Sequence, residues 1–280
     1  MPQTRKVPIN AGAEWLLGGF GLLRRAPLAL GLLAVIWGGL SVAASMSQLL
    51  PLNLLLALLG PILFGGLVYA AREVDQGRKA LPVHLLQGPR DGKLGRLLAM
   101  LLPQVAALVV VVVLLYVLVG SDNLQRLMQV AVELQANPDP ALIQDLPTGR
   151  LFVWLLLAIL AGILAGFFTF VAVPQVMFTD SSALAAMRAS FQACLRNLGA
   201  LVVLFVLVFI TVIALSIAAN LVALLVHALA GEHAAVFVAQ LLLMAVLLPV
   251  LAGAVYFAWK QLLGEGSAAV VATTGSGIEA

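Results

Sequence analysis

The chain has 280 residues, of which 63% are hydrophobic and only 10% are charged, and its formal net charge is +3. Charged residues make up about 25% of an ordinary soluble domain, so this composition excludes a normal water-soluble surface. The small, dispersed positive charge gives no reason to expect nucleic acid as a partner. The single cysteine, Cys194, excludes an intrachain disulfide and a thiolate metal cluster.

Long, continuous apolar stretches predict an all-α polytopic membrane protein with six transmembrane helices and short amphipathic interfacial helices. A bilayer core about 30 Å thick needs about 20 apolar residues in each helical span. The stretches are continuous rather than alternating, which excludes a β-barrel. Within a transmembrane domain at residues 27–263, the spans are predicted at about 28–48, 54–71, 97–119, 151–178, 198–229 and 234–263.

Residues 1–26 are predicted to form a cytosolic N-terminal segment with an interfacial helix. Its apolar residues at helical spacing are Trp15, Leu16, Phe20 and Leu23, and the basic residues around them include Arg24 and Arg25. A cleaved signal peptide is the alternative, because these arginines precede an apolar run. The charges begin too far from the N-terminus and the run is too long for that class of segment.

Prolines and glycines interrupt several of the predicted spans. The second span carries Gly60, Pro61, Gly65 and Gly66, which predicts a kink and close approach by a neighbouring helix. The predicted kinks are at Pro61, Pro103, Pro174 and Pro249. Accommodation in packing is the common reason for such prolines, and a substrate cavity lined by broken helices is the functional alternative.

The connections between the spans alternate between short turns and amphipathic segments. Residues 72–96 are rich in charge and are predicted to be aqueous, and a short amphipathic helix is expected after Ser121, ending near Asn137. In 181–197, apolar residues at helical spacing predict a helix lying flat on the cytosolic leaflet; they are Leu184, Met187, Phe191, Leu195 and, just beyond, Leu198. Residues 264–280 are predicted to be a disordered cytosolic tail.

The basic residues are distributed unevenly between the two sides of the six spans. With a cytosolic N-terminus, Arg126 and Arg150 alone fall on the opposite side, and the other thirteen of the 15 lysines and arginines are cytosolic. The positive-inside rule therefore predicts that both termini lie in the cytosol. Arg24, Arg25, Arg188 and Arg196 are the predicted contacts to lipid headgroups.

The sequence offers no catalytic centre. Apart from Lys260 near the end of the sixth, the predicted spans contain no Asp, Glu, Lys or Arg, which argues against ion coupling and intramembrane hydrolysis. His227, Glu232 and His233 form the one candidate zinc group, but polar residues bordering a turn are the simpler interpretation. We therefore expect no enzymatic activity, no cofactor and no metal.

The chain resembles bacterial inner-membrane proteins of the YciC-like family and the membrane domain that precedes some glycerophosphodiester phosphodiesterases. The resemblance is carried by Trp15 with Arg24, Arg25 and Pro27, by Gly60 to Gly66, and by Pro174 to Asn197 with Ala186, Met187, Arg188, Ser190, Phe191 and Arg196. It implies a six-helix membrane fold and no established activity. The phosphodiesterase domain is missing, so the resemblance carries over no catalytic residue.

Two functional hypotheses follow. The first is a non-enzymatic inner-membrane protein whose helix bundle organises membrane lipids or other membrane proteins. The alternative is a transporter or channel for a neutral or lipidic substrate, because the lack of buried charge does not exclude lipid handling. The most useful observation would be a lipid or small molecule bound between the spans, because a dry, fully packed bundle would exclude the transporter.

Overall fold

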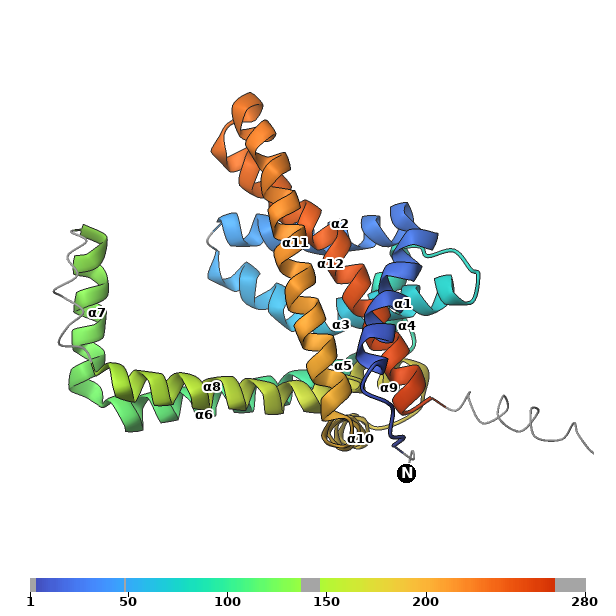
Figure 1. Ribbon diagram of the computed structural model, residues 1–280, viewed down its shortest axis with the longest axis horizontal. Coiled ribbons are helices and arrows are strands. Elements are labelled where there is room, and N and C mark those ends of the chain that lie inside the picture. The colour runs from blue at the N-terminus through green and yellow to red at the C-terminus, as the bar shows by residue number, and fades with distance from the viewer. Residues whose placement is uncertain (1–3, 48, 137–146, 265–280) are drawn as a thin grey trace, which may run out of the picture. The chain divides into compact units, whose positions relative to one another are not determined.

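The computed structural model describes residues 4–47, 49–136 and 147–264. Over these residues the chain is all-α, without β-strands, as predicted (Figure 1). The helices are α1 (Ala11–Arg25), α2 (Pro27–Ser47), α3 (Leu50–Asp75), η1 (Pro82–Leu86), α4 (Gln87–Arg90), α5 (Leu94–Leu98), η2 (Ala99–Leu101), α6 (Leu102–Val119), α7 (Ser121–Ala136), α8 (Thr148–Thr169), α9 (Ala172–Phe178), α10 (Ala183–Arg196), α11 (Leu198–Ala230) and α12 (Glu232–Leu262).

Six helical segments among the described residues are long and apolar enough to cross a membrane, which makes the chain an integral membrane protein by length and composition. They are Pro27–Ser47, Leu50–Asp75, Leu94–Val119, Thr148–Phe178, Leu198–Ala230 and Glu232–Leu262. The third and fourth of these are interrupted, the third by the 3₁₀ turn η2 and the fourth between α8 and α9. Of the predicted tail 264–280, only Gly264 lies within the described residues.

The chain divides into two compact units, one formed by Leu102–Phe167 and the other by the rest of the chain. The smaller unit contains α6, α7 and most of α8. Within it, the indole Nε1 of Trp154 donates a hydrogen bond to the carbonyl of Val111 at 3.0 Å, which joins α8 to α6. Gly120, with φ +82°, provides the left-handed residue at the turn from α6 into α7.

In the larger unit, α1 packs against both α11 and α12 through small residues. A Cβ atom added at Gly12 would lie 2.1 Å from the carbonyl oxygen of Ala200 on α11, and one added at Gly19 would lie 2.2 Å from that of Val250 on α12. Trp15 is fully buried at this junction. The glycines therefore allow α1 to contact the backbones of two long helices directly.

This packing changes the interpretation of the N-terminal helix. The sequence predicted that Trp15 and Leu16 belong to an apolar stripe facing lipid, but both are buried against protein, and Phe20 and Leu23 are partly buried. Arg24 and Arg25 in the last turn are exposed. The apolar face of α1 is therefore a helix-packing surface, because an amphipathic pattern shows which residues avoid water but not whether protein or lipid covers them.

Helices α2 and α3 form a hairpin that packs on α12, and the connector after α3 folds back onto it. A Cβ at Gly66 on α3 would lie 2.4 Å from the Cα of Leu85 in η1, so this glycine sets how closely the connector approaches. Leu67 and Val68 of α3 are fully buried in the resulting core. Residues 72–96, predicted to be an aqueous loop, thus include a packed helical connector.

The four prolines predicted as kinks fall into two groups. Pro61 and Pro249 lie inside the continuous helices α3 and α12. Pro103 is the second residue of α6 and Pro174 the third residue of α9, so each stands in the first turn of a helix that follows an interruption. A first turn tolerates proline because its N–H would have no helical partner, and these two sites mark helix starts.

The segment predicted at 181–197 is the helix α10, which begins with Ser182 capping the N–H of Ala185 at 3.3 Å. Its buried face is made of small residues together with Met187: Ala186, Ala189, Ser190, Ala193 and Cys194. Leu184 and Leu195 from the predicted apolar stripe are exposed, and Phe191 stacks on Phe168 with ring centroids 4.5 Å apart. The helix therefore packs through its small-residue face and leaves two leucines uncovered.

Candidate functional site

Charged and polar side chains meet where the C-terminal ends of α3 and α12 approach the end of α1. The carboxylate of Asp75 accepts hydrogen bonds from Lys260 Nζ and from the hydroxyl of Tyr256, both at 2.9 Å. Arg25 Nη1 lies 4.0 Å from the other carboxylate oxygen. Asp75 therefore joins three helices at the end where the sequence predicts the cytosolic face.

The end of α9 reaches the same region through Gln175, which is buried. Its Oε1 accepts a hydrogen bond from the indole of Trp259 at 2.7 Å, and its Nε2 donates to Thr179 and Ser181. Lys93 Nζ donates to the carbonyl of Met177 at 2.7 Å. The helix ends that the sequence assigns to the cytosol are thus held together by side chains.

The N-terminal segment is fastened at the junction of α10 and α11. Asn197, buried, accepts a hydrogen bond from the N–H of Val7 at 2.8 Å and donates to the carbonyls of Arg5 and Ala193, each at 2.9 Å. The N–H of Arg5 donates to the carbonyl of Leu262 at 3.1 Å. Residues 5–7 therefore bridge the start of α11 and the end of α12.

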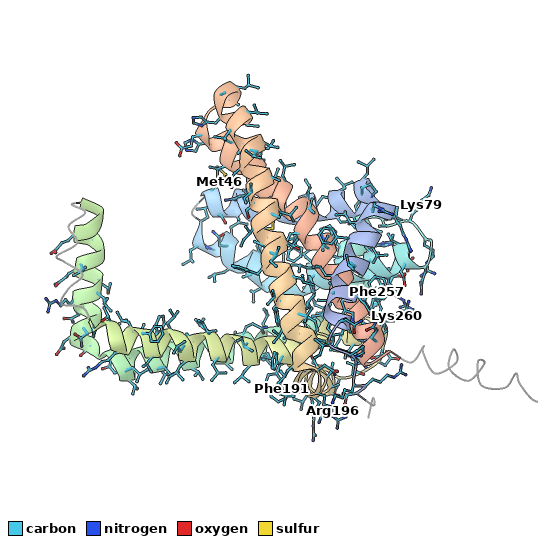
Figure 2. The ribbon with its side chains drawn as sticks, in the orientation of Figure 1. Met46, Lys79, Phe191, Arg196, Phe257 and Lys260 are labelled. Atoms are coloured by element: carbon cyan, nitrogen blue, oxygen red, sulfur yellow. The ribbon has the colours of Figure 1, made fainter. Side chains whose placement is uncertain are left out.

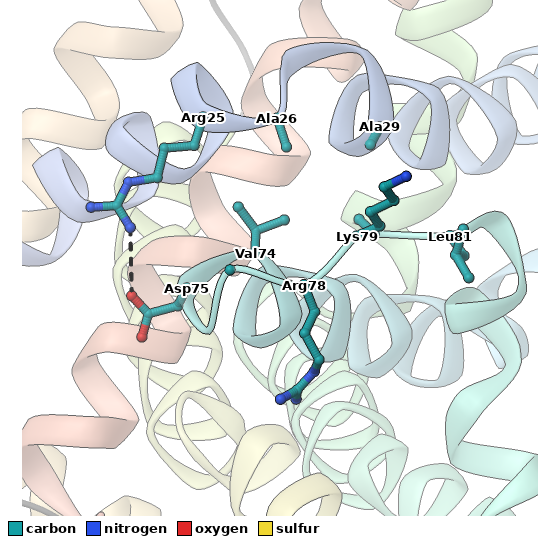
Figure 3. A pocket seen from close by; sticks show the side chains of 10 residues that line it. Arg25, Ala26, Ala29, Val74, Asp75, Arg78, Lys79 and Leu81 are labelled. Carbon is teal, nitrogen blue, oxygen red and sulfur yellow. Dashed lines mark ion pairs between the residues drawn. The ribbon is translucent and has the colours of Figure 1, made fainter.

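An open-sided cavity of about 450 Å³ lies between the α1–α2 junction and the segment that follows α3 (Figure 3). Its charged lining residues are Arg25, Arg78, Lys79 and Asp75, and its apolar ones include Ala26, Ala29, Val74 and Leu81. Lys79 extends toward the first turn of α2, whereas Arg78 extends the opposite way (Figure 3). The cavity thus has more cations than anions on its walls, which favours an anionic group.

Glu73, near the end of α3, is buried and paired with Arg78 through two hydrogen bonds. The bond to this carboxylate raises the pKa of the Arg78 guanidinium. His84 packs edge-on against Tyr69, and burial lowers the pKa of its imidazole, with opposing influence from Glu73. Its Nδ1 accepts the N–H of Leu81 at 3.2 Å, so the neutral ring holds the start of η1 in place.

The four arginines predicted to contact headgroups do not form a single cluster. Arg25 lies at the cavity beside Asp75, and Arg196 on α10 donates to the carbonyl and hydroxyl of Thr4. Figure 2 shows Arg196 projecting outward from α10. Arg24 and Arg188 are exposed, and neither side chain has an ion pair or hydrogen bond among the described residues.

Cys194 is fully buried on α10, and this burial raises the pKa of its thiol to about 12. A thiol with so high a pKa is not a nucleophile at neutral pH. Among the described residues, no three His, Cys, Asp or Glu side chains lie close enough to hold a metal ion, so His227, Glu232 and His233 do not form such a group.

Sequence reasoning missed the residues that build this end of the protein. Asp75 and Lys260 are 185 positions apart, and Trp259 and Gln175 are 84 apart, so no local pattern links them. Lys79 lies within residues 72–96, for which the sequence predicts only a charged, aqueous segment. Comparisons of the chain with protein-family models, with curated proteins and with solved structures gave no match.

Proposed function

We propose that the protein is a non-enzymatic, integral protein of the bacterial inner membrane that organises anionic lipids on the cytosolic leaflet. Membrane lipids are its main partners, and other membrane proteins are secondary ones. The chain also resembles the YciC-like family in the segments named above, and we propose that relationship on the same footing. A six-helix bundle with a basic, lipid-facing end fits both the proposed function and the proposed family relationship.

The observation that carries this proposal is the exposed face of α10. Leu184 is 75% exposed and Leu195 is exposed on the same stripe, with Arg188 one turn after Leu184. Exposed leucines beside Arg188, which has no described partner, suit a membrane surface, where leucine enters the acyl boundary and arginine reaches the phosphates. The buried small-residue face on the other side fixes α10 to the protein.

The proposed orientation places both termini in the cytosol. Support comes from the excess of basic residues on one side and from the contacts among helix ends. The ends of α3, α9 and α12 and the start of α11, all assigned to the cytosol by the charge count, are linked through Asp75, Gln175 and Asn197. When successive spans cross the membrane in alternating directions, the ends of the second, fourth and sixth spans lie on the same side as the start of the fifth. These contacts agree with that arrangement.

We expect the cysteine variant Q192C to resist a membrane-impermeant thiol reagent in intact cells, whereas S121C and E232C react. All three positions are exposed, and native Cys194 gives no background because it is buried with a raised pKa. Permeabilised cells, in which Q192C also reacts, serve as the control. Labelling of Q192C but not of S121C and E232C in intact cells would reverse the orientation.

For α10 we expect the substitution Arg188→Glu to weaken the membrane contact of the helix about ten-fold. A basic residue at an anionic surface contributes about 1 kcal/mol, and the introduced carboxylate adds repulsion. The measurement uses a spin label at Leu195 in bilayers containing phosphatidylglycerol and compares its accessibility to oxygen and to a polar relaxant. In the wild type the label reports lipid, and in R188E it shifts toward water.

Two controls make this result specific. Arg90→Glu changes the charge equally on the connector after α3, where Arg90 is exposed and has no described side-chain bond, and leaves the Leu195 label unchanged. A label at Gln192, further round α10, reports a more aqueous site than Leu195. If both labels report the same aqueous environment in the wild type, α10 does not lie on the membrane and the proposed function is wrong.

The alternative, a transporter for a neutral or lipidic substrate, is favoured by one observation. A cavity of about 300 Å³ between α2 and α3 is lined by Ser41, Ser45 and Asn53 together with Trp37 and Gly60. Asn53, however, donates to the carbonyls of Ala44 and Leu49, and Ser41 to that of Trp37, so these side chains already stabilise the hairpin. A substrate bound in this cavity would favour the transporter over the lipid-organising protein.

A further inference from the structure

We propose that the cavity beside Arg25 and Lys79 is a specific binding site for the phosphate group of an anionic phospholipid, whose acyl chains lie along the exposed face of α2. This inference rests on the proposed function and gives it a defined site, separate from the α10 surface. The occupant is one lipid molecule rather than a diffuse layer of headgroups.

The cavity has the size and position that such a headgroup requires. Its volume of about 450 Å³ falls within the range of about 300–1,000 Å³ usual for small-molecule sites. Its walls come from the end of α1, the first turn of α2 and the segment after α3. The start and end of two membrane-long helices meet there, which places the cavity at the depth of the phosphates.

Two cations on the cavity wall are available to a ligand. The Lys79 side chain has no ion pair or hydrogen bond among the described residues and extends across the opening toward α2 (Figure 3). The Arg25 side chain is 65% exposed and lies 4.0 Å from Asp75, a weak contact, whereas Lys260 and Tyr256 hold Asp75 at 2.9 Å. Arg25 can therefore turn its guanidinium to a phosphate without leaving Asp75 unpaired.

The third cation of the lining does not contribute in the same way. Arg78 is bound by both carboxylate oxygens of buried Glu73 and by the side chain of Gln76. Removing it would leave Glu73 without its partner and would test the fold of the connector rather than the ligand. Arg25 and Lys79 are therefore the residues that we assign to the phosphate.

The N-terminal end of α2 borders the cavity together with the C-terminal ends of α1 and α3. Ala26 and Ala29 line the cavity, so the first turn of this 21-residue helix borders it. Helix N-termini carry about half a positive elementary charge and bind phosphates through their backbone N–H groups. At this cavity the two C-terminal ends carry the opposite partial charge, and Pro27 at the start of α2 has no N–H, so the full charges of Arg25 and Lys79 carry the site.

The exposed apolar surface beside the cavity identifies the ligand as a lipid rather than a soluble phosphate. Leu28, in the first turn of α2, is 87% exposed, and Leu32, Ile36 and Leu40 continue the exposed stripe at intervals of four residues. Leu81, on the cavity wall, is also exposed. A soluble phosphate ester would use none of this surface, whereas acyl chains would cover it.

The test measures the binding of single lipids to the purified full-length protein in detergent by native mass spectrometry. We expect the wild type to retain phosphatidylglycerol in preference to phosphatidylcholine. The double substitution R25Q/K79Q should weaken the binding of the first phosphatidylglycerol about 30-fold, because each basic residue contributes about 1 kcal/mol and 1.4 kcal/mol is ten-fold. D75N, which removes the one acid of the lining, should tighten it several-fold.

The matched control is K6Q/R90Q, which also removes one lysine and one arginine, from exposed positions that neither line the cavity nor belong to the α10 surface. It should leave the first binding event within two-fold of the wild type. Binding by R25Q/K79Q equal to the wild type, or an equal loss in K6Q/R90Q, overturns the site. D75N also separates an effect on the site from damage to the fold, because a damaged fold would not bind phosphatidylglycerol more tightly.

Glycerophosphoglycerol, the soluble headgroup, separates the two sources of phosphate. We expect no displacement of the lipid at millimolar concentration, and displacement would overturn the assignment to a lipid. The outcome is also distinguishable from failure of the proposed function. If the cavity fails to bind phosphatidylglycerol specifically while the spin label at Leu195 reports lipid, only the cavity site is rejected. If the label at Leu195 reports water, the surface role of α10 is rejected, even when the cavity binds lipid.

Discussion

The substitutions Gly12→Ala and Gly19→Ala in α1 are expected to destabilise the protein strongly, each by about 1–3 kcal/mol. A methyl group would lie 2.1 Å from the Ala200 carbonyl oxygen at Gly12 and 2.2 Å from that of Val250 at Gly19, and both obstacles are backbone atoms. Because the long helices α11 and α12 cannot yield locally, α1 has to move away. Thermal unfolding in detergent, followed by helicity and by retention of the monodisperse species, measures the effect.

Gly21 provides the control within the same helix. A Cβ at this position meets no atom within 4 Å, and the residue is exposed. Gly21→Ala should be neutral or stabilise by about 0.5–1 kcal/mol, because alanine favours the helix interior over glycine. If all three alanine variants unfold at the same temperature, the close packing of α1 on α11 and α12 is wrong.

The substitution Asn197→Ala is expected to release the N-terminal segment and lower stability by about 2–3 kcal/mol. Its side chain makes three hydrogen bonds, to Val7, Arg5 and Ala193, and the residue is buried. Each bond contributes about 1 kcal/mol, and the groups left unpaired add to the loss. Hydrogen exchange of residues 4–10 should accelerate more than that of α12.

Asn220→Ala is the corresponding control on α11. Asn220 is exposed, and within the part of the chain that the structure describes its amide donates only to the carbonyl of Ser216 in its own helix, at 2.8 Å. Its removal should change stability by less than about 0.5 kcal/mol. Equal exchange of residues 4–10 in the wild type and in N197A would show that Asn197 does not hold the segment.

The fold could be predicted from the sequence to the level of six membrane-long helices, because continuous apolar runs leave few alternatives in a bilayer. The sequence does not predict which face of each helix is buried against protein. On α10 the strongest apolar residues, Leu184 and Leu195, are exposed, and Ala186, Ala189 and Ala193 are buried instead. Small side chains carry little hydropathy, but they allow helices to approach closely. The packed face is therefore chosen by residue size, which a hydropathy pattern does not report.

The candidate site could be predicted only in its charge. The rule that basic residues gather on the cytosolic side gave Arg25 as a headgroup contact, and the structure places Arg25 at the cavity. Lys79 was missed, because its role depends on how the connector folds back on α3 around Gly66. Asp75 was missed because its partners, Tyr256 and Lys260, lie on the last helix of the chain.

The docking of α1 also sets the order in which the protein can be assembled. Trp15 and Gly19 are among the first residues to leave the ribosome, but the surfaces that cover them, on α11 and α12, are made last. At a synthesis rate of roughly 5–20 residues per second, the roughly 190 residues between Gly12 and its neighbour Ala200 correspond to about 10–40 s. During that interval the apolar face of α1 lacks its neighbours on α11 and α12, so a membrane surface or a chaperone has to shelter it until synthesis ends.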